Sequence, residues 1–158
     1  MTDKYIETKY GYDVINGGAK VNVITKVAEL TTENASGDII RFATLPAKAV
    51  ITRIVIGCTA LTGLTDTDLG IYKTNEGDTL DADLFMDGQT LATASKSLDG
   101  LQTVSVANSN KNIKDLYDVV NTADLQEQFV DVALTLNATP TASGSVSIMI
   151  EYCWLNGG

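Results

Sequence analysis

Alternation of apolar and polar residues with a period of two is the strongest signal along this chain. In the segment VDVALTLN, the residues on one side of an extended backbone are Val130, Val132, Leu134 and Leu136. In SVSIMIEY, the corresponding residues are Val146, Ile148, Ile150 and Tyr152. This period indicates strands with one face in a core and the other toward solvent. Because ATPTASG between them has the composition of a loop, we predict that the pair forms the last antiparallel hairpin.

The segment GDIIRFATLPAKAVITRIVIG, residues 37–57, has the same design. Ile40 and Phe42 share one face of its first predicted strand. On its second strand the pattern places Thr52, Ile54, Ile56 and Cys58 on one face, and Ile51, Arg53 and Val55 on the other. Pro46 lacks a backbone donor, which suits a connection between strands. We therefore predict a hairpin whose loop carries Lys48 as its one charge, displayed at an edge.

Several shorter segments extend this pattern to about seven strands. The further strand candidates are Lys20–Leu30, Asp68–Lys73, Gln89–Ala94 and Gln102–Ala107. Short strands separated by frequent turn signals predict a mainly β protein, an antiparallel β-sandwich of either the jelly-roll or the immunoglobulin-like type.

One helix interrupts the strands in NKNIKDLYDVV. Its apolar residues recur with helical spacing at Ile113, Leu116, Tyr117 and Val120. Asn110 or Asn112 is suited to cap the start of this helix, because an Asn side chain accepts a hydrogen bond from a free amide. A second helical turn is expected near Asp81–Met86.

The first 18 residues differ from the rest, and we assign residues 1–18 to an N-terminal arm and residues 19–158 to a single sandwich domain. The arm contains three of the six tyrosines and ends in a glycine pair that suits a hinge. Tyrosine is enriched at protein interfaces, so the segment is either an arm that docks on another chain or a tail. The residues that we expect at an interface are Tyr5, Ile6, Tyr10, Tyr12 and Lys48.

The composition excludes several classes of function. The net charge of −9, from 20 acidic and 11 basic residues, argues against a nucleic-acid partner. No apolar run approaches the roughly 20 residues that span a membrane, and the N-terminus is too charged for a secretory signal. The chain has no histidine, which removes Ser-His-Asp and Cys-His nucleophile systems and most zinc sites. We therefore expect no enzyme, no catalytic residue and no cofactor.

Acidic residues gather between Asp66 and Asp87, where oxygen ligands for calcium are available. The EF-hand spacing begins with Asp81 and Asp83, but Phe85 occupies the next ligand position. We therefore expect solvated loop acids, with a calcium site as the open alternative. A glycosidase pair is also open, but nothing in the sequence marks two of these carboxylates as facing each other.

The two cysteines, Cys58 and Cys153, each follow an alternating apolar segment. We expect both to be buried as small hydrophobic residues, with one disulfide as the alternative.

The order of these features is similar to that of small capsid-associated proteins of tailed bacteriophages, of the head decoration or cement type. The resemblance is carried by GDIIRFATLPAKAVITRIVIG, TDLGIYK, DADLFMDG and VDVALTLNATPTASGSVSIMIEY. In such proteins a Gly-Asp-hydrophobic strand leads through Leu-Pro and a small basic turn to a second hydrophobic strand, and a final hairpin ends in Glu-Tyr. The match covers about residues 21–152 and carries over no catalytic residue.

The resemblance implies a sandwich or jelly-roll subunit, often a homotrimer, that binds the outside of an assembled capsid and bridges its capsomers. Its partners would be the major capsid protein and further copies of itself, with no nucleic acid and no membrane. Such a protein is made in the host cytoplasm and resides on the capsid surface of the virion. The acidic charge is compatible with that exterior position.

Two other classes stay open. One is a different virion component, such as a tail tube or head fibre base subunit. The other is a carbohydrate- or ligand-binding sandwich, which usually displays an aromatic platform on one face. Only 6% of the residues here are aromatic, which disfavours that second class.

Overall fold

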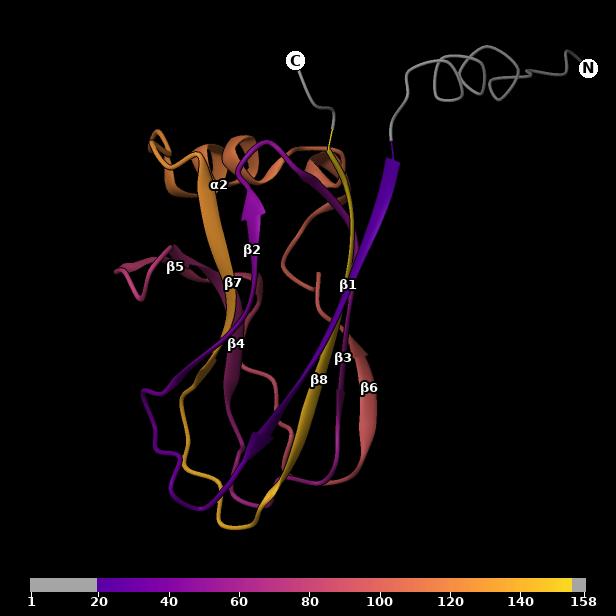
Figure 1. Cartoon of the computed structure of the whole chain (residues 1–158), viewed down its shortest axis with the longest axis vertical. Helices are drawn as coiled ribbons and strands as arrows, with labels where there is room; N and C mark the ends of the chain where they lie inside the picture. Colours follow the sequence, from indigo (N-terminus) through magenta and orange to yellow (C-terminus); the bar gives the residue numbers. More distant parts are fainter. Residues whose placement is uncertain (1–19, 155–158) are drawn as a thin grey trace, which may run out of the picture.

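Two four-stranded antiparallel sheets face each other in the structure, a computed structural model that describes residues 20–154 (Figure 1). The first sheet has the strand order β1 (Lys20–Leu30), β8 (Gly144–Trp154), β3 (Val50–Cys58) and β6 (Lys96–Asp99). The second sheet has the order β2 (Ile39–Pro46), β7 (Phe129–Leu136), β4 (Thr67–Lys73) and β5 (Thr79–Met86). This is the arrangement of an eight-stranded jelly roll, which confirms the predicted fold class.

Consecutive strands mostly alternate between the two sheets, and this corrects both predicted hairpins. β2 and β3 belong to different sheets, and so do β7 and β8. Within the part of the chain that the structure describes, β4 and β5 are the only consecutive strands that are hydrogen-bonded neighbours. Alternation shows only that each strand has one buried face. It does not show whether two such strands pair in one sheet or pack against each other from facing sheets. The three residues between β2 and β3 are enough to cross the roughly 10 Å that separates two packed sheets.

The core lies between the sheets and follows the predicted faces of β7 and β8. The fully buried residues of these two strands include Val130, Val132, Leu134, Leu136, Val146 and Ile150. Ile148 is also buried, at 2% exposure, whereas Tyr152 is only half-buried at the edge of the cluster. The predicted core faces of both strands are therefore confirmed. The other face of β7 was expected toward solvent, but Ala133 is fully buried there and Asp131 is only 7% exposed.

On β3 the predicted faces are wrong at one end because the strand contains a bulge. The pairing with β8 shifts between Ile51 and Arg53, so Thr52 is the extra residue. A bulge resets the alternation by one position. Ile51 therefore joins Ile54 in the core, and Thr52 is exposed.

Three further predictions of local structure are wrong. Residues 81–86 belong to strand β5 and not to a helical turn, and residues 102–107 form turns leading into the short 3-10 helix η1 (Val106–Asn108). Residues 89–94 form a loop, after which β6 follows. The apolar character of that loop comes from Leu91, which is fully buried while its backbone pairs with Leu61 and Leu64.

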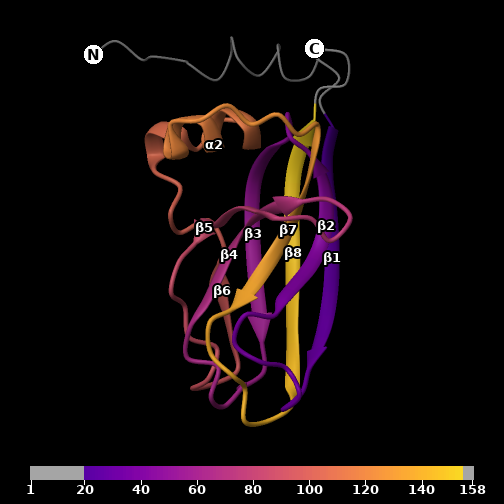
Figure 2. The same cartoon turned by 90° about the vertical axis from the view of Figure 1, so that its left-hand side faces the viewer.

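The predicted helix is confirmed as α2 (Ile113–Asn121), which covers one end of the sandwich (Figure 2). Asn112 caps it, since its side-chain oxygen accepts from the Asp115 amide at 2.8 Å. The β2–β3 loop satisfies two more free amides, because Ala49 and Ala47 accept from Ile113 and Lys114 at 3.0 and 2.8 Å. The β2–β3 loop, which follows Pro46, therefore supports the start of α2.

Both cysteines are free and half-buried, so neither is buried as fully as we expected. They lie at opposite ends of the β3–β8 pairing, where Cys58 faces Val146 and Cys153 faces Val50. Within residues 20–154, no helix has the length and apolar character needed to cross a bilayer.

An ionic cluster centred on Arg41 ties β2, β4 and β7 together. The Arg41 guanidinium pairs with Asp131 at 2.9 Å and donates to the carbonyl oxygens of Lys73 and Gly77 at 2.8 and 2.7 Å. It also lies over the ring of Tyr72, 5.3 Å from the centroid. Tyr72 itself is buried and shares a hydrogen bond with Thr135, so this cluster is structural.

Candidate interaction surface

Both ends of the described chain lie at the same end of the sandwich, together with α2 (Figure 1). Lys20, the first described residue, pairs in register with Trp154, the last one. The β2–β3 loop, residues 47–49, lies there too, because it is hydrogen-bonded to the start of α2. We call this part of the molecule the termini end.

The termini end carries a groove of about 350 Å³. Its apolar lining consists of Pro46, Ala47, Leu125, Phe129 and Trp154. Phe129 is 47% exposed and Trp154 is 37% exposed, which is unusual for two large aromatic side chains that lie close together. Further lining residues are polar and include Lys48, Gln126 and Gln128. We call this feature the aromatic groove.

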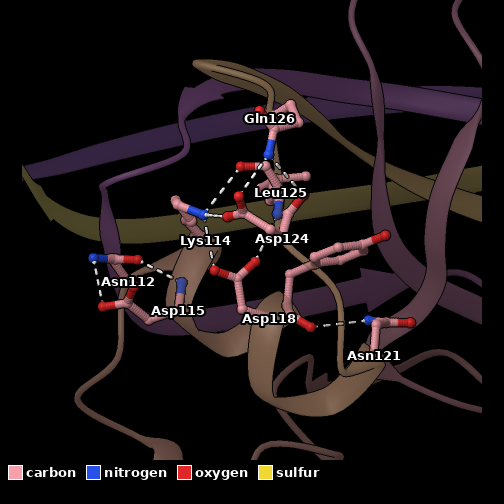
Figure 3. Close-up of polar contacts among 9 residues, drawn as sticks. Asn112, Lys114, Asp115, Asp118, Asn121, Asp124, Leu125 and Gln126 are labelled. Atoms are coloured by element: carbon pink, nitrogen blue, oxygen red, sulfur yellow. Dashed lines mark hydrogen bonds and ion pairs between the residues drawn. The ribbon is translucent and has the colours of Figure 1, made fainter.

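Lys114 holds one wall of the aromatic groove in place (Figure 3). Its ammonium donates to the Asp118 carboxylate at 2.8 Å, to Asp124, and to the Leu125 carbonyl at 3.1 Å. Asp118 in turn accepts from the Leu125 amide at 2.7 Å. The hydrogen bond to Asp118, followed by that to Asp124, raises the pKa of Lys114 to about 12. The same contact with Lys114 lowers the pKa of Asp118.

The opposite wall is the β2–β3 loop. The Ala47 amide donates to the Gln128 carbonyl at 2.9 Å, which joins this loop to the segment that leads into β7. Lys48 is exposed, as the prediction of an edge position required, and it has no ion-pair partner among residues 20–154. Side-chain hydrogen bonds of Lys114 and Asp118 hold the first wall and a backbone hydrogen bond holds the second, so the groove is preformed.

Of the predicted interface residues, the structure places only Lys48, which lines the aromatic groove. Tyr5, Ile6, Tyr10 and Tyr12 lie outside the described residues. Phe129 and Trp154 were not among the predicted interface residues. A signal for Phe129 was present, since the alternation of the segment that follows puts it on the same side as Asp131, away from the core.

The expectation of solvated loop acids between positions 66 and 87 is wrong for several of them, because Asp68 lies on β4 and Asp81 and Asp83 lie on β5. Asp81 is buried and accepts from the side chain of Asn121 at 2.6 Å and from the Asp83 amide at 3.3 Å. Hydrogen bonding to Asp81, with burial as a smaller cause, raises the pKa of Asp83 to about 6. Among residues 20–154, no group of three or more potential ligands is placed to hold a metal ion.

Comparison with known proteins finds similarity of fold only. No protein-family model and no curated protein matches the chain. A chain in the structure described as "Capsid of Ralstonia phage GP4" superposes with a TM-score of 0.60 at 16% identity, covering 84% of this chain and 83% of that one. A chain of the "Cyanophage Pam1 capsid asymmetric unit" superposes with a TM-score of 0.51 at 17% identity, covering 86% of each.

The near-equal coverage means that the matched chains are close to this one in length. Both superpositions include most of the chain, so they compare whole jelly rolls and not a shared fragment. This protein therefore has a jelly-roll fold that also occurs in the capsid structures of two bacteriophages.

Proposed function

We propose that this chain is a virion structural protein that binds the exterior of a phage capsid and stabilises it by bridging capsomers. The observation that carries the proposal is the superposition on a chain of similar length from a phage capsid structure. Its partners are the major capsid protein and other copies of itself, most simply in a homotrimer. The protein acts without catalysis, is made in the host cytoplasm and resides on the capsid surface.

The physical basis is linkage between binding and assembly. A protein that contacts two neighbouring capsomers binds the assembled shell more tightly than the free subunits, so its binding shifts the equilibrium toward the shell. A trimer presents three such contacts at once, and avidity then raises the overall affinity without strong individual contacts. The net charge of −9 supports an exterior position, where no contact with packaged DNA is required.

The termini end is the surface that we assign to these contacts. Exposed aromatic side chains in a preformed groove favour protein binding, because aromatic anchors dominate the energetics of interfaces. Lys48 lines that groove. Lys20, to which residues 1–19 are joined, is the register partner of Trp154, which also lines the groove. Tyr5, Ile6, Tyr10 and Tyr12 therefore complete the proposed interface from the N-terminal side.

Antibody labelling of intact virus particles tests this function and its location. Gold-labelled antibodies raised against the folded protein are applied to undisrupted particles produced from the genome that encodes the chain, with antibody preabsorbed on the purified protein as the control. Labelled heads are the expected result. Label confined to tails would indicate a tail tube subunit instead, and particles that contain none of the protein would contradict a virion role.

Light scattering tests the homotrimer. The purified protein is expected to have three times the 16.8 kDa mass of one chain. A clean monomer at micromolar concentration would contradict trimer formation. Deletion of residues 1–18 is expected to leave the sandwich folded and to weaken its binding to capsids; unchanged binding would show that the arm takes no part.

A further inference from the structure

The aromatic groove has the properties of a peptide-binding site. Phe129 and Trp154 are each more than one-third exposed, and Pro46, Ala47 and Leu125 complete an apolar lining. Ligand sites are typically preformed, mostly apolar concavities with a few polar groups, and a volume of about 350 Å³ lies within their usual range. The site is therefore suited to apolar side chains that also carry a hydrogen-bonding group.

The chain itself supplies such side chains beside the groove. Nineteen residues precede Lys20, and Lys20 is the register partner of Trp154, which lines the groove. Residues paired across antiparallel strands have Cα atoms about 5 Å apart. Residues 13–19 can span at most about 25 Å when extended, so Tyr12 and the residues before it have enough chain to reach the groove.

The composition of the N-terminal segment matches the lining of the groove. Residues 5–12, YIETKYGY, contain three tyrosines and one isoleucine. A tyrosine ring is apolar enough to pack on Phe129 and Trp154, while its hydroxyl needs a polar partner of the kind that Gln126 and Gln128 offer. Glu7, the acidic residue of this segment, has the charge that complements Lys48, which has no ion-pair partner among residues 20–154.

We propose that the aromatic groove is a docking site for tyrosine-rich peptide, and that its occupant in the isolated protein is residues 5–12 of the same molecule. A short flexible tether gives an effective concentration in the millimolar range, about a thousandfold above a second copy at micromolar concentration. The glycine pair at positions 17 and 18 permits the reversal of chain direction that docking within one molecule requires.

Docking would join two separate parts of the proposed interface into one surface. The tyrosines would lie next to Lys48 at the termini end, with one side of each ring against the groove and the other facing outward. The inference concerns the isolated chain and does not rest on capsid binding, so either can fail without the other.

The single tryptophan of the chain is a built-in reporter, because Trp154 lines the groove. Its fluorescence is measured, with selective excitation, in the full-length protein and in the variant Tyr5→Ser/Tyr10→Ser/Tyr12→Ser. We expect the triple variant to show a red-shifted emission maximum and stronger acrylamide quenching. The matched variant with Phe at the same three positions keeps the apolar rings and should resemble the natural protein.

Two further measurements identify the occupant. The emission of the full-length protein should not change across a wide dilution series. A synthetic peptide of residues 1–16 should bind the protein lacking residues 1–16 and shift its emission back, but should bind the full-length protein at least tenfold more weakly. Phe129→Ser should abolish peptide binding to the truncated protein, and far-ultraviolet circular dichroism verifies that this variant is folded.

Three outcomes would overturn the inference. Identical emission and quenching of the natural protein and the Ser variant would mean that the segment does not cover Trp154. A red shift on dilution, accompanied by loss of an oligomer in light scattering, would identify the segment of a second copy as the occupant. Equal peptide affinity for the truncated and full-length proteins would mean that the groove stands open in the natural protein.

Discussion

Replacing Arg41 by methionine tests whether the ionic cluster on the second sheet holds β2, β4 and β7 together. Methionine retains an unbranched apolar side chain but removes the guanidinium group. The change deletes the pair with Asp131 at 2.9 Å and the hydrogen bonds to the carbonyls of Lys73 and Gly77. The Asp131 side chain, 10% exposed, would keep Thr44 as a hydrogen-bond partner but no counter-charge within the cluster.

The size of the effect follows from the burial of the pair. Breaking a buried ion pair by removing one partner costs about 3–5 kcal/mol, because the other charge is left uncompensated. The Arg41 side chain is 21% exposed, so water can partly replace it. We therefore expect a loss near the lower limit, about 3 kcal/mol of unfolding free energy. That is a large part of the roughly 5–15 kcal/mol that stabilises a typical domain.

Urea unfolding at fixed protein concentration measures this loss. Arg53→Met is the matched control, since Arg53 is exposed and forms no ion pair with another residue in the described range; it should change stability by less than about 0.5 kcal/mol. The double variant Arg41→Met/Asp131→Leu should recover much of the loss, because an apolar pair can replace a buried ionic one.

Two results would refute this reasoning. A loss below about 1 kcal/mol for Arg41→Met would mean that the pair behaves like one on an open surface. A double variant as unstable as the single one would mean that the contacts with the two backbone carbonyls, and not the charge on Asp131, decide the outcome.

Four other changes give distinct results. Ile148→Asp should lower the melting temperature strongly, by several kcal/mol of stability, because it buries an unpaired charge at a position 2% exposed; an unchanged melting temperature would mean that this face of β8 points outward. Gly70→Ala should destabilise the protein as measured by urea unfolding, since a Cβ there would overlap the Asp81 carbonyl; tolerance would show that β4 and β5 can separate. Asp83→Asn should stabilise the protein at neutral pH, because the folded-state pKa of Asp83 is raised from 3.8 to about 6 and the ionised carboxylate therefore destabilises the fold. This advantage should shrink as the pH falls from about 6 to 3.8; equal stability of both proteins at neutral pH would contradict it. The Lys114 contacts should stabilise the protein fully below pH 10.5 and progressively less up to about pH 12, because the folded-state pKa of Lys114 is raised from 10.5 to about 12. The unfolding free energy of Lys114→Met, measured across this pH range, should lack that decline.

Much of the candidate interaction surface was inaccessible to sequence analysis for a physical reason. Lys48 could be placed in an exposed loop because Pro46 and the apolar runs around it define that loop locally. The groove beside it depends on three segments that are distant in sequence, the β2–β3 loop, the start of β7 and the end of β8. The exposure of Phe129 and Trp154 follows from what these segments leave uncovered, and no local pattern records it.

Alternation and helical spacing report local geometry, and from them β1, β2, β3, β4, β7, β8 and α2 could be predicted, together with the core faces of β7 and β8. Long-range packing, which no local pattern records, places β2 and β3 in opposite sheets, turns Ile51 inward through a bulge at Thr52, and sets α2 on the β2–β3 loop. Strand pairing depends on contacts between residues far apart in the chain, and an apolar face fits a neighbour in either sheet equally well.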